Sequence, residues 1–251
     1  MPKSQVNPVA ERVLHRLHAY DEARSIHGLV PSKGLPATTR RFAADHSVYH
    51  QGQPATHFFE VTSGVLMLSK MTEDGRRHVV EIVPVGWICG FSAGGCYDAS
   101  CDALTDTIAI SYKRTDVEKA ESTQDRQRFL HGMERQICAL HDHGLLLSRK
   151  SAEERVAAFL MRFVPGRGVP HCAGPALTND DAGIEVPMGG REIGDFLGLN
   201  AETVSRAITK LERGGLITRV EGKRNNYHII DVCRLCQAAH NDCGLASQMA
   251  G

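Results

Sequence analysis

The spacing of apolar residues changes several times along this chain of 251 residues. From about residue 40 to residue 113 the apolar positions form short runs, as in HFFEVTSGVLMLSK, RRHVVEIVPVGWICGF and TDTIAISYK. Turn residues separate these runs, for example Ser63-Gly64 within the first and Glu73-Asp74-Gly75 before the second. Short strands at this spacing predict a small β-barrel or sandwich.

A helical pattern follows from about residue 122 to residue 147. Its apolar positions lie three and four residues apart, which is the a/d spacing of a two-stranded coiled coil. The predicted seam consists of Leu130, Met133, Ile137, Leu140, Gly144 and Leu147. The same stripe would also suit a helix that packs on its own domain, so the pattern alone leaves dimerisation and intramolecular packing both open.

Another helix is indicated at SAEERVAAFLMRF. Ser151 can cap its first turn, and Glu153 and Glu154 suit the positive end of its dipole. The boundary between two domains is therefore expected near residues 149–150. Residues 1–35 are expected to form an extension, because GLVPSKGLPATTR interrupts their helical pattern with prolines and glycines.

Two short helical patterns flank a glycine in GREIGDFLGLNAETVSRAITKLERGGL. Gly198 suits the turn between them because glycine readily adopts a positive φ, and Asn200 is a good N-cap for the second helix. Gly194 supplies a small residue where the helices would touch, and Val204 supplies an apolar residue beneath the second helix. Together these features predict a helix-turn-helix over about residues 190–209.

The start of the second helix carries polar side chains suited to reading DNA in the major groove. Arg206 can make a bidentate contact to guanine, and Glu202 can accept a hydrogen bond from cytosine. Ser205 can pair with a base edge or a phosphate, whereas Thr203 is expected at the DNA backbone. Glu202 and Arg206 are also spaced for an ion pair within the helix, and both kinds of interaction can coexist.

A basic hairpin is predicted next, since ITRV and YHII frame the loop EGKRNN. From residue 203 to residue 226 basic residues outnumber acidic ones by six to two, although the whole chain balances 29 Lys and Arg against 29 Asp and Glu. Lys223 and Arg224 are placed to meet phosphates. The predicted DNA-binding residues are Glu202, Ser205, Arg206, Thr203, Arg191, Lys210, Lys223 and Arg224.

Three segments resemble the Crp/Fnr transcription regulators, and most of all their FixK (Fnr-like) branch: LLLSRKSAEERVAAFL, FLGLNAETVSR and FEVTSGVLMLSKMTEDGRRHVVEI. The resemblance implies an α+β fold with an N-terminal cyclic-nucleotide-binding-like β-barrel (double-stranded β-helix), a long dimerisation helix and a C-terminal winged helix-turn-helix. The expected ranges are 1–35 for the extension, 36–120 for the barrel sensor domain, 121–148 for the dimerisation helix and 149–251 for the DNA-binding domain.

The same resemblance implies a function. A homodimer would bind double-stranded DNA at a palindrome with half-site TTGA, as in TTGAT-N4-ATCAA, and would activate transcription by recruiting RNA polymerase, in low-oxygen or nitrogen-related metabolism. An enzyme is not expected, because the chain has no P-loop, no HExxH motif and no recognisable nucleophile–base pair. The alternative is a ligand- or redox-gated regulator of the same family that senses a gas, a metal or thiol oxidation.

The barrel differs from that of ligand-binding relatives at the positions that hold the ligand in those relatives. Cyclic-AMP-binding members carry a Gly-Glu pair and an Arg-Ser or Arg-Thr pair, whereas the corresponding stretch here, CGFSAGGCYDASCDAL, contains neither arginine nor glutamate. Oxygen-sensing members hold an iron–sulfur cluster through N-terminal cysteines and one barrel cysteine. Here no cysteine precedes Cys89, and the barrel position is Ile110. Neither cyclic AMP nor an N-terminal iron–sulfur cluster is expected, and no cofactor is predicted.

The remaining cysteines and histidines leave other chemistry open. Zinc-type ligands are grouped at Cys233, Cys236, His240 and Cys243. Along a straight helix these four side chains are too far apart to surround one ion. The alternative is a terminal helix whose small, polarisable side chains pack against the DNA-binding domain. The candidates for a redox-sensitive thiol are Cys96, Cys101 and Cys138. Cys96 and Cys101 are expected in a loop or at a strand edge. The alternative is that these cysteines are buried free thiols. The spacing of His46, His50 and His57 does not favour a haem ligand over surface histidines.

The N-terminal residues MPKSQVNPVAERVLHRLHAY contain neither a long apolar run nor a small-residue cleavage site. No segment has 18 uninterrupted apolar residues, so no membrane span is expected. We therefore expect a cytoplasmic protein without a membrane partner. Its eight cysteines are then expected to be reduced thiols rather than a disulfide framework.

Overall fold

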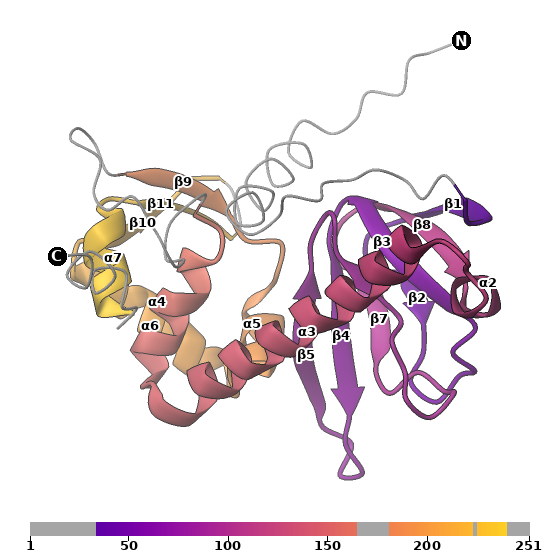
Figure 1. The fold of residues 1–251 in the computed structure, drawn as a ribbon. Helices are drawn as coiled ribbons and strands as arrows, with labels where there is room; N and C mark the ends of the chain where they lie inside the picture. Colours follow the sequence, from indigo (N-terminus) through magenta and orange to yellow (C-terminus); the bar gives the residue numbers. More distant parts are fainter. Residues whose placement is uncertain (1–33, 165–180, 223–224, 240–251) are drawn as a thin grey trace, which may run out of the picture. The chain divides into compact units, whose positions relative to one another are not determined.

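The computed structural model describes residues 34–164, 181–222 and 225–239. Within these ranges the chain divides into two compact units, one ending at His143 and the other beginning at Gly144 (Figure 1). The division falls inside the long helix α3 (Thr123–Arg149), whose last turn belongs to the second unit. The predicted extension at residues 1–35 lies outside the described residues except for its last two.

The first unit is built from antiparallel strands that form two four-stranded sheets, with the orders β1-β8-β3-β6 and β2-β7-β4-β5. The strands are β1 (Ala37–Phe42), β2 (Ser47–Tyr49), β3 (His57–Ser63), β4 (Leu66–Met71), β5 (Arg77–Val83), β6 (Ile88–Cys89), β7 (Ser100–Ala103) and β8 (Thr107–Lys113). The two predicted turns are confirmed, since Gly64 and Gly75 have φ values of 87° and 76°. The predicted β-barrel is therefore present.

Aromatic side chains fill the interior between the two sheets. The ring of Tyr97 stacks on that of Tyr49 with centroids 3.8 Å apart, and Tyr49 stacks in turn on Phe59 at 5.7 Å. The Tyr97 hydroxyl donates to the main-chain oxygen of His57 at 2.9 Å. The segment CGFSAGGCYDASCDAL thus contributes a tyrosine to the core of the barrel.

Cys101 was expected in a loop or at a strand edge, and this expectation is wrong. It lies in β7, which pairs with β2 on one side and β4 on the other, and its side chain is fully buried. The cause is strand alternation: in SCDA the second and fourth residues point inward. Cys89 joins the same core, and burial raises the pKa of the Cys101 thiol well above its usual range. By contrast, Cys96 is exposed between β6 and β7.

Helix α3 packs one face on the barrel, after the short helix α2 (Arg114–Glu118). The ring of Phe129 lies 5.1 Å from that of Phe58. Arg128 forms an ion pair with the buried carboxylate of Glu60, which also accepts a hydrogen bond of 3.1 Å from the Tyr112 hydroxyl. Further along, the His143 ring is hydrogen-bonded to a main-chain oxygen of β5 at 3.0 Å. Polar and aromatic residues together therefore attach α3 to the barrel.

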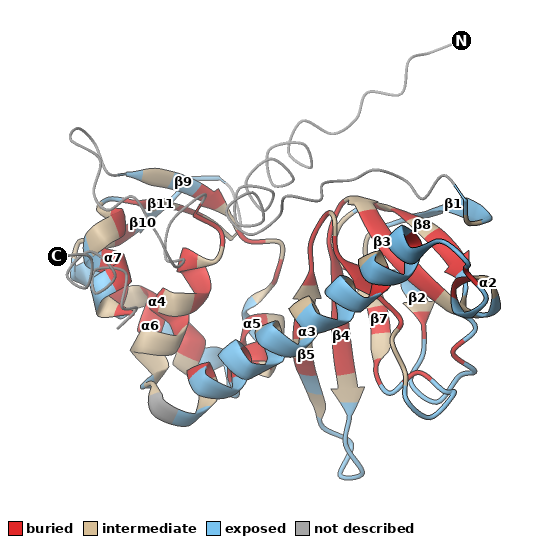
Figure 2. Cartoon of the chain, viewed as in Figure 1, coloured by how far each residue is buried: buried red, intermediate tan, exposed pale blue. Residues whose placement is uncertain are grey.

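The second unit contains four short helices and one small sheet among the described residues. Its helices are α4 (Ala152–Met161), α5 (Gly190–Leu197), α6 (Ala201–Arg213) and α7 (Val232–Ala238). Its strands are β9 (Ala182–Glu185), β10 (Ile217–Arg219) and β11 (Asn226–Ile229), in the antiparallel order β10-β11-β9. Figure 2 colours much of α4 as buried, and the ring of Phe159 in α4 lies 5.7 Å from that of Phe196 in α5.

Ser151 caps α4 as predicted. Its hydroxyl accepts from the Glu154 N–H, and the Glu154 carboxylate accepts from the Ser151 N–H at 2.5 Å. The third strand, β9, was not predicted, because its residues AGIE form only a brief alternation. None of the described helices is both long enough and apolar enough to cross a lipid bilayer.

Candidate nucleic-acid interface

Helices α5 and α6 cross at a point where only glycine fits. A Cβ atom at Gly194 would lie 2.5 Å from the main-chain oxygen of Leu199, a separation that real Cβ atoms do not show. Gly198 ends α5 in the left-handed conformation with φ 63°, and the Leu199 N–H donates to the Gly194 oxygen at 2.9 Å. The predicted roles of both glycines in a helix-turn-helix are confirmed.

Helix α6 begins at the predicted cap. The Asn200 side-chain oxygen accepts from the Thr203 N–H at 2.7 Å. Val204 is 1% exposed and anchors the helix from beneath, as expected. With this side buried, Glu202, Ser205 and Arg206 remain on the exposed side of the first two turns. The interior packing of α6 therefore decides which of its polar side chains face outward.

Glu202 and Arg206 form an ion pair on this exposed face. Their closest oxygen and nitrogen atoms are 2.5 Å apart, and about three quarters of each side chain is exposed, at 71% and 76%. Such an exposed pair at i, i+4 contributes only about 0.3–0.5 kcal/mol. The pair can therefore hold the arginine in position and still break at little cost.

The other predicted DNA-binding residues differ in their surroundings. Arg191 is exposed near the start of α5, while Thr203 is half-buried. Lys210 is exposed but forms an ion pair with Glu153 of α4. The predicted phosphate-binding residues Lys223 and Arg224 lie outside the described residues.

The predicted wing is a hairpin of β10 and β11, in which Arg219 is the partner of Tyr227. Asn225 lies at the entrance to β11 with a φ of 62°, a conformation that asparagine tolerates well. The Arg219 Nε lies 3.2 Å from a carboxylate oxygen of Glu212 near the end of α6. Ion pairing thus links the hairpin to α6.

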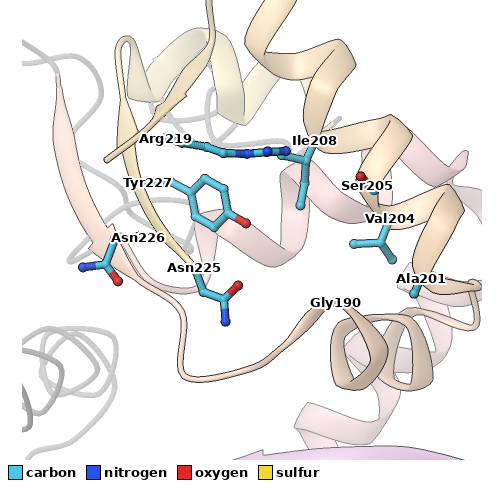
Figure 3. Close-up of a pocket in the computed structure, with 9 residues that line it drawn as sticks. All are labelled: Gly190, Ala201, Val204, Ser205, Ile208, Arg219, Asn225, Asn226 and Tyr227. Atoms are coloured by element: carbon cyan, nitrogen blue, oxygen red, sulfur yellow. The ribbon is translucent and has the colours of Figure 1, made fainter. Parts of the chain in front are cut away.

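A pocket of about 250 Å³ separates α6 from the wing (Figure 3). Its walls are formed by Gly190, Ala201, Val204, Ser205, Ile208, Arg219, Asn225, Asn226 and Tyr227. Of these, only Ser205 was predicted as a site residue. The polar residues of the wing were not predicted as site residues. Arg219 entered the sequence analysis only as one of the basic residues of this segment, and the strand pairing that places Tyr227 opposite it is not evident from the sequence.

The predicted dimer seam lies on a largely exposed face of α3. Leu130, Met133, Ile137 and Leu140 are 40–47% exposed, and Gly144 is exposed as well. The stripe of α3 that packs on the barrel is a different one. Leu147 departs from the others, since it is half-buried and its Cδ2 would lie 3.6 Å from a Cβ at Gly198.

The metal and redox candidates are only partly described. Cys233 is half-buried and Cys236 is buried in α7, whereas His240 and Cys243 lie outside the described residues. Within the described ranges no three His, Cys, Asp or Glu side chains are grouped closely enough to hold a metal ion. Cys138 is exposed on α3.

Among the histidines considered as haem ligands, His46 and His50 are exposed. His57 is half-buried at the start of β3, and its Nδ1 lies 2.9 Å from the Thr56 hydroxyl. Burial lowers the pKa of His57, and the nearby cations Arg40 and Lys113 lower it further. The three side chains are therefore those of ordinary surface and strand-end histidines.

Comparison with known proteins agrees with this architecture. A family model described as a Crp-like helix-turn-helix domain matches residues 154–238, and one described as a cyclic nucleotide-binding domain matches residues 39–123. The nitrogen fixation regulation protein FixK of Bradyrhizobium diazoefficiens is 32% identical over 183 residues, which are 72% of this chain and 74% of that protein. The transcriptional activator protein anr of Pseudomonas aeruginosa is 32% identical over 199 residues, which are 76% of each chain.

A solved structure extends the agreement to three dimensions. The structure of FixK2 from Bradyrhizobium japonicum superposes with a TM-score of 0.68 and 29% sequence identity, covering 81% of this chain and 98% of that one. The β-barrel, the long helix and the helix-turn-helix are thus shared in order and in kind. The chain belongs to the Crp/Fnr family of DNA-binding transcription regulators, which are not enzymes.

Proposed function

We propose that the protein is a transcription activator of the FixK type. It binds as a homodimer to a palindrome with half-site TTGA, as in TTGAT-N4-ATCAA, and recruits RNA polymerase there. The observation that carries this proposal is the exposed face of α6, on which Glu202, Ser205 and Arg206 project from the first two turns. The name of one relative, nitrogen fixation regulation protein, supports a role in nitrogen-related metabolism, and the name of the other, transcriptional activator protein, supports activation. The proposed role in low-oxygen metabolism rests on the family resemblance alone.

The chemistry of the three side chains fits a half-site of this kind. The Arg206 guanidinium matches the O6 and N7 acceptors of guanine, and the Glu202 carboxylate matches the amine of the paired cytosine. TTGA contains one G·C pair, which these two residues can read together. Ser205 supplies a hydroxyl for a neighbouring base edge or phosphate. The ion pair between Glu202 and Arg206 holds both groups in place before DNA arrives.

Reading a palindrome requires a second copy of the chain. The exposed stripe of Leu130, Met133, Ile137 and Leu140 supports pairing through α3, because a row of large apolar side chains on one helix face marks an interaction surface. Two paired α3 helices would present two α6 helices to successive major grooves. We further propose that DNA binding needs no small-molecule effector, since the stretch CGFSAGGCYDASCDAL lacks the arginine and glutamate of cyclic-AMP-binding relatives and contributes Tyr97 to the barrel core.

The test is fluorescence anisotropy with a labelled TTGAT-N4-ATCAA duplex and protein purified in air. Titrations are run at one fixed salt concentration, against a scrambled duplex of the same length, with and without reductant. Tight binding of the palindrome alone, without added ligand, is the expected result. Equal affinity for both duplexes would contradict the proposed half-site.

A redox-gated regulator is the second candidate, and the exposure of Cys96 and Cys138 favours it. An exposed thiol is accessible to oxidants, whereas the buried Cys101 is not. The reductant arm of the same titration separates the two functions. An affinity that changes with reductant, and that no longer changes in Cys96→Ser or Cys138→Ser, would assign the switch to that thiol.

A further inference from the structure

The side chain of Arg155 in α4 donates hydrogen bonds to three main-chain oxygens of the second unit. Its Nη2, Nε and Nη1 atoms donate to Leu147, Lys150 and Leu197, over distances of 2.7–3.0 Å. All three nitrogens of the guanidinium are therefore engaged at the same time. Because this group is planar and rigid, it fixes the three acceptors relative to one another, which a flexible ammonium group cannot do.

The three acceptors connect the end of α3 with the turn of the helix-turn-helix. Leu147 lies in the last turn of α3, Lys150 follows this helix, and Leu197 is the last residue of α5. The next residue, Gly198, forms the turn, and a Cβ there would lie 3.6 Å from both the Leu147 Cδ2 and the Arg155 Nη1. An apolar side chain and a bridging arginine thus adjoin this turn from the side of α3 and α4.

Other contacts attach α4 to both helices of the helix-turn-helix. The ring of Phe159 in α4 packs on that of Phe196 in α5, with centroids 5.7 Å apart. Glu153 of α4 forms an ion pair with Lys210 of α6. Helices α4, α5 and α6 can therefore stay together when the arginine bridge is removed. What Arg155 adds to this group of helices is a connection to the last turn of α3.

The geometry of a palindrome gives this connection a consequence for DNA binding. Each base pair added between two half-sites moves the second one by about 3.4 Å and turns it by about 35° around the duplex axis. In the proposed dimer, Gly144 and Leu147 are seam residues, and Arg155 binds the main-chain oxygen of the second of them. The direction in which each α6 projects from the paired α3 helices therefore decides which spacing both can reach at once.

We propose that Arg155 is a positioning residue that sets the spacing between half-sites which the dimer accepts. Its guanidinium makes the helix-turn-helix move together with the last turn of α3. In this role it acts through the main chain of α3 and α5 and needs no contact with DNA. The inference rests on the proposed function, to which it adds a residue that controls the spacing of half-sites and not the identity of their bases.

The test measures the affinity of the full chain for a series of duplexes by fluorescence anisotropy at one salt concentration. The palindromes carry spacers of two to six base pairs between TTGAT and ATCAA, and a further duplex carries one half-site alone. The wild type is expected to bind the four-base-pair spacer best. Arg155→Gln should bind the single half-site as the wild type does, because the exposed face of α6 is unchanged. Its preference for the four-base-pair spacer over the neighbouring spacers should fall about tenfold, because a looser connection lowers the effective concentration of the second α6 at the matched spacing.

Three further variants separate positioning from charge and from general damage. Arg155→Lys keeps the positive charge but cannot join three carbonyls, so it should lose the spacing preference as Arg155→Gln does. Gly194→Ala disturbs the crossing of α5 and α6 itself. It should weaken the single half-site and every palindrome while keeping the wild-type ranking of spacers. Arg234→Gln alters an exposed arginine of α7 and should behave as the wild type. All titrations are run below the unfolding midpoint of the least stable variant, measured by circular dichroism.

Three outcomes would overturn the inference. The first is an Arg155→Gln protein with the wild-type ranking of spacers. The second is a uniform loss of affinity in that variant on every duplex, the single half-site included, because this is the pattern of a merely structural role. The third is a full spacing preference in Arg155→Lys, which would assign the effect to charge and not to the bridge.

The fate of the proposed function is decided by the wild type alone. A wild type that prefers no spacer would refute the proposed dimeric recognition, and this inference with it. If the wild type binds the scrambled duplex as tightly as the palindrome, the proposed half-site is wrong. The spacer series is then rebuilt on a half-site selected from random duplexes, and the comparison of Arg155→Gln with the wild type is repeated there.

Discussion

The guanidinium of Arg155 donates a hydrogen bond of 3.0 Å to the main-chain oxygen of Leu197, the last residue of α5. The same side chain donates to the oxygens of Leu147 and Lys150, at 2.7 and 2.9 Å. Carbonyls at the ends of helices have no partners within the helix and carry the negative end of the dipole. One arginine thus fastens the last turn of α3 to the first helix of the helix-turn-helix.

Replacing Arg155 should loosen this connection. We expect Arg155→Gln to lower the free energy of unfolding by about 2–3 kcal/mol, because hydrogen bonds from a charged donor contribute more than neutral ones. The measurement is urea unfolding followed by circular dichroism. Arg234→Gln, which alters an exposed arginine of α7, is the matched control. Equal midpoints for the two variants would refute the assignment.

The close approach of α5 to the main chain at Leu199 predicts that no side chain larger than that of glycine is tolerated at Gly194. Gly194→Ala places a methyl group 2.5 Å from the Leu199 oxygen, so the helices must separate or tilt, at a cost of about 1–3 kcal/mol. Gly190→Ala is the control, because a Cβ there meets nothing within 4 Å. Thermal unfolding should show a lower midpoint for the first variant only. A Gly194→Ala protein as stable as the control would show that the crossing can adjust.

If the exposed face of α3 forms the dimer interface, a charged side chain introduced there should disrupt the dimer. In a dimer formed through this face Ile137 would be covered, so Ile137→Glu should give a monomer in sedimentation velocity runs. Leu145→Glu places the same charge on the same helix at a residue that is 61% exposed and lies outside the seam. That variant should sediment like the wild type. A dimeric Ile137→Glu protein would exclude this face as the seam.

Replacing Arg206 on the exposed face of α6 should reduce the discrimination between DNA sequences and not the affinity alone. Arg206→Ala should remove about 1–3 kcal/mol for each base contact that the guanidinium makes. The preference for the palindrome over the scrambled duplex should therefore fall, while binding of the scrambled duplex changes little. Anisotropy titrations at constant salt measure both affinities. Wild-type discrimination in this variant would mean that other residues read the half-site.

The cysteines should differ in reactivity according to burial. Because burial raises the pKa of Cys101, the thiol stays protonated near neutral pH and is also shielded from reagents. Alkylation of the native protein with iodoacetamide, mapped by peptide mass spectrometry, should modify Cys96 and Cys138 first. Cys101 and Cys89 should react only in denaturant. Early modification of Cys101 would indicate that the barrel opens on the timescale of the labelling.

Local chemistry explains which elements could be predicted from the sequence. Gly194, Gly198 and Asn200 each meet a requirement set by residues a few positions away, so the helix-turn-helix was evident without the structure. The pairing of β1 with β8 is different, because it joins residues about seventy positions apart and nothing in either strand specifies its partner. For the same reason Cys101 was placed at an edge although β7 lies between two strands.

The candidate site likewise contains features that could be predicted from the sequence and features that could not. The exposed face of α6 follows from helical spacing, so Glu202, Ser205 and Arg206 could be grouped together from the sequence; that they read DNA stays a prediction. The pocket was not, because it depends on the register that places Arg219 opposite Tyr227 and on the fold that brings both beside α6. The barrel-facing stripe of α3 was also missed. It mixes Phe129 with polar residues such as His143, so an apolar pattern does not reveal it.

The two stripes of α3 also bear on how such a regulator can change over evolutionary time. Residues buried against the barrel, such as Phe129 and His143, alternate along one helix with exposed residues such as Ile137 and Leu140. If α3 pairs as proposed, substitutions on the outward stripe would alter partner choice without disturbing the packing of α3 on the barrel. Substitutions on the barrel-facing stripe would in turn leave the pairing surface intact. Under that proposal, duplicated copies of such a gene would be able to diverge in pairing specificity while the contacts between α3 and the barrel stay the same.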